Sequence, residues 1–217
     1  VCFWPYGYNS FHCDVTAQLK EGSNDIVVLL ENREQSSRWY PGAGLYRKVR
    51  HITQPQVHVP VWGTYVTTPH IGKEHAVVSV RTKIEGVEKG SAVTLRTRIL
   101  DAGGHAVAGI TDTRLLHFGE IEQTLTVENP TLWSPEAPVM YFVETEVYAG
   151  GSVNTDWNMD RPEISIADGT VPCDKVSTRF GFRTIEIIPD KGFFLNGEAR
   201  KFRGVCLHHD LGPLGAA

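Results

Sequence analysis

The chain has 217 residues, a formal net charge of −4 and 41% hydrophobic residues. This length suits one large domain or two small ones, because hydrophobic cores stop growing at about 250 residues. Lysine and arginine are scattered singly, so the chain has no basic stripe to neutralise phosphates, and we expect no nucleic-acid partner. No apolar run approaches the roughly 20 residues of a membrane span, so we expect no membrane partner either.

The four cysteines are Cys2, Cys13, Cys173 and Cys206, and none of them forms a C-x-x-C pair. Their spacing argues against a zinc site, and a chain of this size does not need a disulfide framework. We therefore expect buried or half-buried free thiols and no cofactor in this chain. Cysteine usage favours no particular compartment.

The first predicted elements are two strands separated by a loop. Residues 25–32 (DIVVLLEN) are rich in β-branched side chains and bounded by polar residues, which favours a buried strand over a helix. Pro41, Gly42 and Gly44 then require a tight loop, after which 45–52 is predicted to run as another strand.

The middle of the chain shows short strands at regular intervals. Polar and apolar residues exchange at every second position in 77–84 and 92–99, as they do in a sheet with one buried face. Six or seven such strands make an immunoglobulin-like β-sandwich, so the expected fold class is all-β. The predicted strands are 57–67, 74–85, 91–100, 121–128, 140–148 and 175–185.

Two irregular segments interrupt this pattern. Residues 129–141 (NPTLWSPEAPVMY) predict a proline-stiffened crossing that brings Trp133 to the edge of the domain. Residues 151–173 have no clear period and predict a long surface loop, in which Trp157 is either solvated or an inter-domain contact.

The end of the chain predicts a hairpin that enters a new domain. Residues 184–188 and 199–205 are β-prone runs, and they are joined by Asp190-Lys191-Gly192 and Asn196-Gly197 turn signals. An Asn-Gly pair is the strongest two-residue hairpin signal.

Three blocks of sequence resemble glycoside hydrolase family 2, and within it the β-galactosidases. They are 38–49 (RWYPGAGLYRKV), 129–141, and 179–205, which begins RFGFR and ends FRGV. The resemblance implies the C-terminal part of a jelly-roll domain at 1–52, an immunoglobulin-like β-sandwich at 53–184, and the first β element of a (β/α)8 barrel at 185–217. It further implies that the chain is an excerpt of a retaining enzyme that removes terminal β-D-galactose.

The resemblance places the chemistry outside this chain. Retaining glycosidases use two carboxyl groups about 5 to 5.5 Å apart. In the family both are glutamates on later barrel strands, so no catalytic residue is assigned here and the chain is expected to be inactive. The resemblance also places His208, His209 and Asp210 in the loop after the first barrel strand. It thereby implies that these three residues contact the substrate. Cys206 stands where the family has asparagine.

The same histidines also suit a disordered tail or a metal site. Consecutive side chains in an extended segment point to opposite sides, which disfavours one ion held by both His208 and His209. Arg38 and Trp39 belong either to a structural corner that seats the sandwich against the barrel or to a loop that helps border the sugar pocket. Trp133 is either buried packing or a stacking platform for a sugar ring.

Other functions compete with the scaffold of a β-galactosidase. The chain is alternatively a carbohydrate-binding or adhesion module, or part of a β-glucuronidase or β-mannosidase. A third alternative is an interaction domain that forms homo-oligomers through the edges of strand 25–32. The expected partner of the whole enzyme is a β-galactoside or another oligosaccharide, and its metal requirement is left open. The possible sugar platforms are Trp39, Trp62, Trp133 and Trp157.

Overall fold

The computed structural model describes residues 1–7, 9–31, 33–35, 44–45, 47–88, 91–115, 119–149, 153–156, 163–166 and 169–206. The chain divides into two compact units, one made of Val1–Ile52 with Arg203–Ala217 and the other of Thr53–Phe202. The domain boundaries expected from the sequence, at residues 52 and 184, stay predictions.

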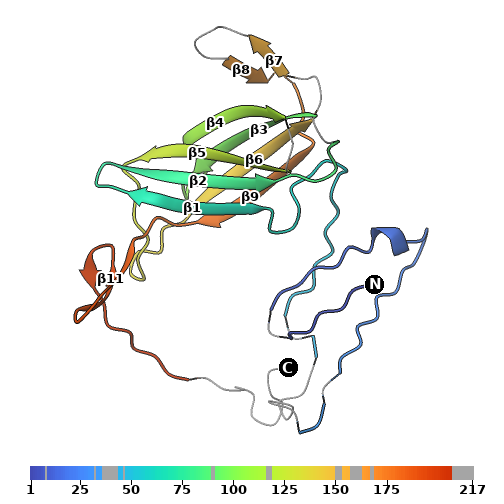
Figure 1. The fold of residues 1–217 in the computed structure, drawn as a ribbon, viewed down its shortest axis with the longest axis horizontal. Coiled ribbons are helices and arrows are strands. Elements are labelled where there is room, and N and C mark those ends of the chain that lie inside the picture. The colour runs from blue at the N-terminus through green and yellow to red at the C-terminus, as the bar shows by residue number, and fades with distance from the viewer. Residues whose placement is uncertain are drawn as a thin grey trace. The chain divides into compact units, whose positions relative to one another are not determined.

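The second unit is built on seven antiparallel strands in two sheets, which confirms the predicted all-β class (Figure 1). One sheet has the order β1-β2-β5 and the other the order β4-β3-β6-β9. The chain changes sheet between β2 and β3, between β4 and β5 and between β5 and β6, as in an immunoglobulin-like sandwich. The strands are β1 (Thr64–Ile71), β2 (His75–Lys83), β3 (Ala92–Leu100), β4 (Ala106–Leu115), β5 (Glu120–Glu128), β6 (Tyr141–Ala149) and β9 (Asp174–Phe180).

The core lies between the two sheets because each strand alternates buried and outward side chains. β5 alternates along its whole length, with Ile121, Gln123, Leu125 and Val127 buried and their neighbours exposed. Phe182, which follows β9, is fully buried and meets the rings of Tyr141 and Phe180 edge-on, with ring centroids 4.8 and 5.1 Å away.

Buried polar side chains divide this core into two hydrophobic clusters. Thr97 donates a 2.6 Å hydrogen bond to Gln123 Oε1 and lies 3.3 Å from the hydroxyl of Thr145. The Thr97–Gln123 bond joins β3 of one sheet to β5 of the other, so it fixes the relative register of the two sheets. One cluster is centred on Val80, Leu125 and Phe182, and the other contains Val59, Ile84 and Leu95.

Three strands were not expected from the sequence. β4 pairs with β3 across the turn at Asp101–Gly104, although Ala106, Ala108 and Gly109 weaken its β pattern. The region predicted as a long loop contains the antiparallel pair β7 (Val153–Asp156) and β8 (Glu163–Ile166). In each case pairing with a neighbouring strand outweighs weak local propensity.

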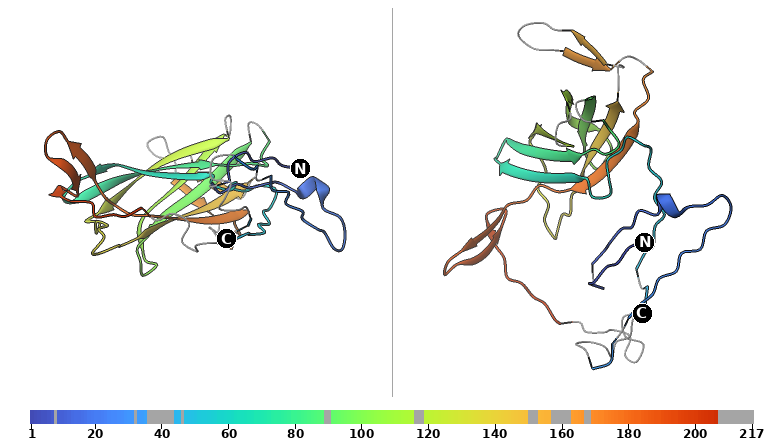
Figure 2. Two further views of the ribbon diagram at one scale, coloured as in Figure 1. Left: turned by 90° about the horizontal axis from the view of Figure 1, so that it is seen from below. Right: turned by 45° about the vertical axis from the view of Figure 1, so that its right-hand side comes forward.

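The predicted C-terminal hairpin forms, with a correction to its last strand. β10 (Ile185–Ile188), β11 (Gly192–Leu195) and β12 (Glu198–Ala199) make a small meander beyond the end of β9 (Figures 1 and 2). Its turns fall at Asp190 and at Asn196-Gly197, as predicted, and both Asp190 and Asn196 have positive φ. The run 199–205 is not a strand, because only Glu198 and Ala199 find partners on β11.

The first unit corrects the predicted strands at 25–32 and 45–52. Its described residues contain one short 3-10 helix, η1 (Thr16–Gln18), and no strand. Ile26, Val27 and Leu29 are 78%, 88% and 93% exposed. A strand needs a hydrogen-bonded neighbour, and the described residues supply none to this segment. The jelly-roll assignment of 1–52 stays a prediction.

The cysteines are free, but three of them are not buried as expected. Cys2, Cys173 and Cys206 are exposed, and Cys13 is half-buried. No helix among the described residues has the length and apolar character needed to cross a membrane.

Candidate functional site

The residues that the sequence singled out for sugar contact are only partly described. His208, His209 and Asp210 lie outside the described residues, as do Arg38, Trp39 and Trp157. Their roles stay predictions. Within the described part, the structure brings together two polar clusters that sequence reasoning did not identify, one on the outer face of the larger sheet and one beside Trp133.

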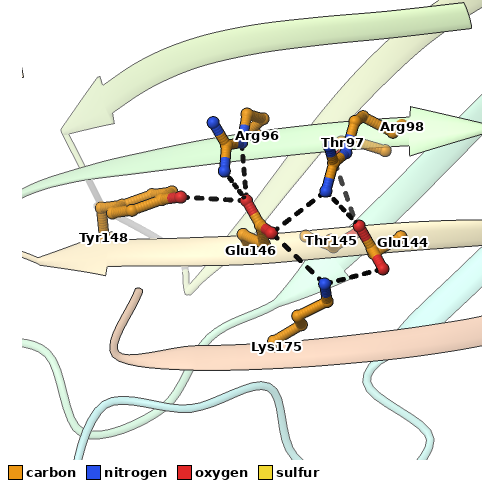
Figure 3. A network of polar contacts seen from close by, with 8 residues as sticks. All are labelled: Arg96, Thr97, Arg98, Glu144, Thr145, Glu146, Tyr148 and Lys175. Carbon is orange, nitrogen blue, oxygen red and sulfur yellow. Dashed lines mark hydrogen bonds and ion pairs between the residues drawn. The ribbon is translucent and has the colours of Figure 1, made fainter. Parts of the chain in front are cut away.

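The first cluster is a charged ladder on the outer face of β3, β6 and β9 (Figure 3). The antiparallel register sets Arg96 opposite Glu146 and Arg98 opposite Glu144. Arg96 Nε donates to Glu146 Oε2 at 2.6 Å, and Arg98 forms an ion pair with Glu144 and reaches Glu146 Oε1 at 3.2 Å. Two directly opposed ion pairs therefore tie the central strands of the sheet together.

Lys175 and Tyr148 complete this ladder. Lys175 on β9 lies directly beside Glu146, and its Nζ is 2.9 Å from Glu144 Oε2 and 3.5 Å from Glu146 Oε1. The Tyr148 hydroxyl donates to Glu146 Oε2 at 2.9 Å. Three cations thus surround two carboxylates whose side chains are only 13% and 6% exposed.

These contacts keep both carboxylates ionised. Burial raises the pKa of Glu144, but hydrogen bonds and charge from Lys175 and Arg98 outweigh it, so the pKa lies below its ordinary value. Burial likewise raises the pKa of Glu146, and hydrogen bonds from Arg96 and Tyr148 more than reverse the effect. The pKa of Tyr148 is raised by burial and by its bond to Glu146.

The ladder is suited to holding strands together rather than to acid–base chemistry. A general acid of a glycosidase keeps a proton near neutral pH, which requires a raised pKa. Glu144 and Glu146 have the opposite shift, and their oxygens are occupied by cationic partners. We therefore assign the ladder a structural role in the sheet.

A sequence signal for the ladder exists in retrospect. Residues 95–99 read L-R-T-R-I and 143–147 read V-E-T-E-V, so opposite charges alternate with buried residues at the same period. What the sequence does not specify is that these two strands are neighbours and in this register.

The second cluster surrounds the crossing segment at Trp133. Trp133 is half-buried, its Cβ lies 3.2 Å from the position that a side chain on Gly181 would occupy, and Arg183 lies over its ring at 5.2 Å from the centroid. Its backbone N–H donates to Phe182 O at 2.7 Å. Trp133 therefore packs against 181–183 instead of presenting an open ring, whereas Trp62 is 63% exposed.

Asn196 connects this segment to the C-terminal meander. Its backbone N–H donates to Thr184 O, its Oδ1 accepts from Thr184 N, and its Nδ2 donates to Trp133 O, each at 3.0 Å. The Asn-Gly turn thus does more than reverse the direction of the chain. Its asparagine side chain joins the meander to the sandwich.

Arg200 makes a further connection beside a shallow hollow of about 500 Å³. Arg200 Nη1 donates to Glu136 Oε1 at 2.6 Å, and Nη2 donates to Glu198 Oε2 at 3.1 Å. The hydrogen bond and charge of Arg200 hold the pKa of Glu136 below its ordinary value. The hollow is lined by Leu132, Ser134, Glu136, Leu195, Asn196, Glu198 and Arg200.

Neither cluster is a metal site. Across the part of the chain that the structure describes, no group of three or more His, Cys, Asp or Glu side chains is arranged to hold a metal ion.

Comparison with known proteins identifies the family to which this architecture belongs. Residues 57–160, which cover most of the sandwich, match the family model "Glycosyl hydrolases family 2". The chain is also 37% identical over 98% of its length to the β-galactosidase BoGH2A of Bacteroides ovatus, and it spans 24% of that protein. The chain belongs to glycoside hydrolase family 2.

Family 2 relatives with different printed activities match this chain almost equally well. A putative β-glucuronidase of Formosa agariphila is 36% identical over 98% of the chain, which spans 18% of that protein. The chain thus spans about a quarter or less of these curated family 2 relatives.

Solved family 2 structures share the fold. A glycosyl hydrolase family 2 member from Bacteroides cellulosilyticus aligns with 75% of this chain and 20% of its own, with a TM-score of 0.58 and 32% identity. A putative β-galactosidase from Bacteroides fragilis aligns with 74% of this chain and 23% of its own, with a TM-score of 0.58 and 28% identity.

Proposed function

We propose that this chain supplies the non-catalytic scaffold of a retaining, exo-acting β-galactosidase, which hydrolyses terminal non-reducing β-D-galactose residues of β-galactosides. The observation that carries the proposal is the resemblance to the Bacteroides ovatus β-galactosidase along nearly the whole chain. The alternative is a β-glucuronidase, and the similar resemblance to the Formosa agariphila protein favours it.

The role of the sandwich in this proposal is to position neighbouring parts of the enzyme. The meander β10–β12 is joined to the crossing segment by Asn196 and by the Arg200–Glu136 ion pair. In the proposed enzyme this meander leads into the catalytic barrel, so these contacts orient the start of the barrel on the sandwich.

The first test assays the purified chain with chromogenic β-galactosides. We expect no turnover, because the two catalytic glutamates are proposed to lie on barrel strands outside this sequence. Turnover that co-purifies with the chain and is absent from a mock purification would contradict the scaffold role.

The second test concerns the whole enzyme from which the chain derives. We expect a kcat/KM for an aryl β-galactoside at least about tenfold above those for the matching β-glucuronide and β-mannoside, since a site built for one polar substituent rejects others. A preference for the glucuronide would assign the β-glucuronidase activity instead.

A further inference from the structure

The first residues of the chain form two antiparallel arms around a turn. Residues 1–7 run in one direction and the segment that leads to η1 returns beside them (Figure 1). Trp4 on the first arm stacks on Phe11 of the second, with ring centroids 5.9 Å apart and planes 14° from parallel. The stacked pair fixes which residues face each other across the two arms.

Cys2 and Cys13 face each other in the same register. Each lies two residues farther from the turn than its neighbour in the Trp4–Phe11 pair, and a step of two residues returns to the same side of an extended chain. The Cys2 thiol lies 4.0 Å from the carbonyl oxygen of His12, the residue directly before Cys13. The two cysteines are therefore neighbours across the arms.

The Cys2 thiol is also close enough to Cys13 to affect its pKa. A hydrogen bond with the Cys2 thiol is the largest of the effects that raise the pKa of Cys13. Cys2 is exposed and Cys13 is half-buried, so a small reagent in solvent reaches Cys2 directly.

This placement meets the geometric requirement of a disulfide. Residues directly opposite in paired antiparallel strands have Cα atoms about 4.5 to 5.5 Å apart, and the Trp4–Phe11 stack holds the two arms side by side without strand pairing. Disulfides join residues with Cα atoms about 4.4 to 6.8 Å apart. The Trp4–Phe11 stack already holds the arms side by side, so the bond closes by rotation of the two thiols toward each other.

We propose that Cys2 and Cys13 are a redox-active pair that a small-molecule disulfide, such as oxidised glutathione, converts into an intramolecular disulfide across the N-terminal arms. The bond closes a loop that contains the turn and the Trp4–Phe11 stack. Oxidation thereby locks the arms in the arrangement that the reduced chain already has.

The chemistry is two successive thiol–disulfide exchanges. The Cys2 thiolate attacks one sulfur of the oxidant, a mixed disulfide forms, and one glutathione thiolate leaves. Cys13 then loses its proton to solvent and attacks the Cys2 sulfur, which releases the second glutathione thiolate. Two protein thiols are oxidised, one oxidant disulfide is reduced to two thiols, and the protons pass from the cysteines to the released thiolates.

The other two cysteines provide matched controls. Cys173 and Cys206 are exposed like Cys2, but Cys173 lies in the other compact unit and Cys206 in the segment after the meander. Exposure alone would make them react as well as Cys2, whereas pairing is expected only for Cys2 with Cys13.

The test treats the purified chain with oxidised glutathione, then labels the remaining thiols with a maleimide under denaturing conditions. We expect Cys2 and Cys13 to take up neither label nor glutathione and their linked peptides to weigh about 2 Da less for the loss of two hydrogens, whereas Cys173 and Cys206 take up the label or carry a glutathione adduct. Both cysteines fall before Lys20, the first trypsin site, so chymotrypsin is used to cut between them after Tyr6 or Phe11 and release a linked pair of peptides.

The variants separate the pair from a general thiol reaction. Cys173→Ser and Cys206→Ser should still form the internal disulfide, whereas Cys2→Ser and Cys13→Ser should give only glutathione adducts. Four labelled thiols after oxidation, or a bond that joins other cysteines, would overturn the proposal. So would an intermolecular bond as the main product, because the arms would then not hold the two thiols together.

Discussion

At the scale of single residues, the backbone at Gly86 is the most constrained position that the structure reveals. Gly86 has φ of 78°, and a Cβ added there would lie 1.7 Å from the carbonyl oxygen of Gln56. This contact belongs to the place where His58 and Glu85 form an isolated antiparallel bridge. Only a residue without a side chain lets these two segments approach.

We expect Gly86→Ala to destabilise the chain by about 3 kcal/mol, because the new methyl group must displace backbone and adopt a left-handed conformation. The matched control is Gly104→Ala, whose φ is 83° but whose Cβ would meet nothing within 4 Å. The control should lose only about 1 kcal/mol for the conformation itself. Urea unfolding measures the free energy of unfolding of both variants. Equal losses of stability would mean that the contact with Gln56 is unimportant.

Asn196 is the residue that makes the Asn-Gly turn specific to this fold. Asn196→Gly keeps the left-handed backbone and removes the side-chain bonds to Thr184 N and Trp133 O. We expect a loss of about 1 to 2 kcal/mol, concentrated in the meander, because two partly buried partners lose their hydrogen bonds. Hydrogen exchange at the Thr184 amide reports it directly.

Asp190→Gly is the control for this change. Asp190 also has positive φ, at 62°, and its side chain makes no hydrogen bond among the described residues. Relief of its left-handed strain should leave stability unchanged or slightly improved. If the Thr184 amide is equally protected from hydrogen exchange in Asn196→Gly and in the unchanged chain, the turn is held by its backbone alone.

At the scale of secondary-structure elements, the charged ladder makes the stability of β3, β6 and β9 depend on pH. Glu144 and Glu146 have folded-state pKa values below their ordinary value of 4.5. A carboxyl with a depressed pKa stabilises the fold fully above its unfolded pKa, and the stabilisation disappears as pH falls through the folded pKa. The ladder is therefore complete at neutral pH and is lost progressively below about pH 4.5.

We expect the free energy of unfolding to fall more steeply below this pH in the unchanged chain than in the double variant Glu144→Gln/Glu146→Gln. At pH 7, Glu146→Gln alone should cost about 1 to 3 kcal/mol, since Arg96 and Tyr148 lose a charged partner that is nearly buried. Denaturant unfolding across a pH series measures both effects.

The control for the ladder is an exposed ion pair in the other sheet. Glu120 Oε1 lies 3.6 Å from Arg81 Nη1, and the side chains of Arg81 and Glu120 are 45% and 35% exposed. Glu120→Gln should cost less than about 1 kcal/mol, because water screens the pair. If the two single variants cost the same, burial does not strengthen the ladder.

At the scale of the whole molecule, the exposed apolar run in the first unit is the feature from which we predict association. Residues 26–30 are five consecutive aliphatic side chains, all exposed, on a backbone that no described strand pairs. Such a segment is a template for strand addition. We therefore expect the isolated chain to self-associate as its concentration rises, which light scattering measures.

Val27→Lys/Leu29→Lys should remain monomeric over the same concentrations, because charges on an unpaired segment oppose edge-to-edge pairing. Ile185→Lys/Ile187→Lys is the comparison variant, since these side chains are also exposed but lie on a strand that already pairs with β11. A monomeric unchanged chain would contradict the prediction.

The period-two pattern was enough to predict most strands of the sandwich, and the Asp190-Lys191-Gly192 and Asn196-Gly197 signals predicted both turns of the meander. It predicts a strand wherever one face is buried, as in β5, because the alternation itself records the burial. It failed for β4 and for the pair β7–β8, where neighbouring strands supply the stabilisation, and for 25–32, to which the described part of the chain supplies no neighbouring strand. The ladder was missed for a related reason: its charges are visible in two strands, but their pairing is not.

The sequence by itself determined the fold class, the turns and the family, because periodicity, Asn-Gly signals and ordered motif blocks are local properties of the chain. Only the tertiary structure decided that Arg96 faces Glu146, that Asn196 reaches Trp133 and that Trp4 stacks on Phe11. These contacts join residues far apart in the sequence or across a turn. Their geometry depends on strand register, which many distributed packing contacts set together.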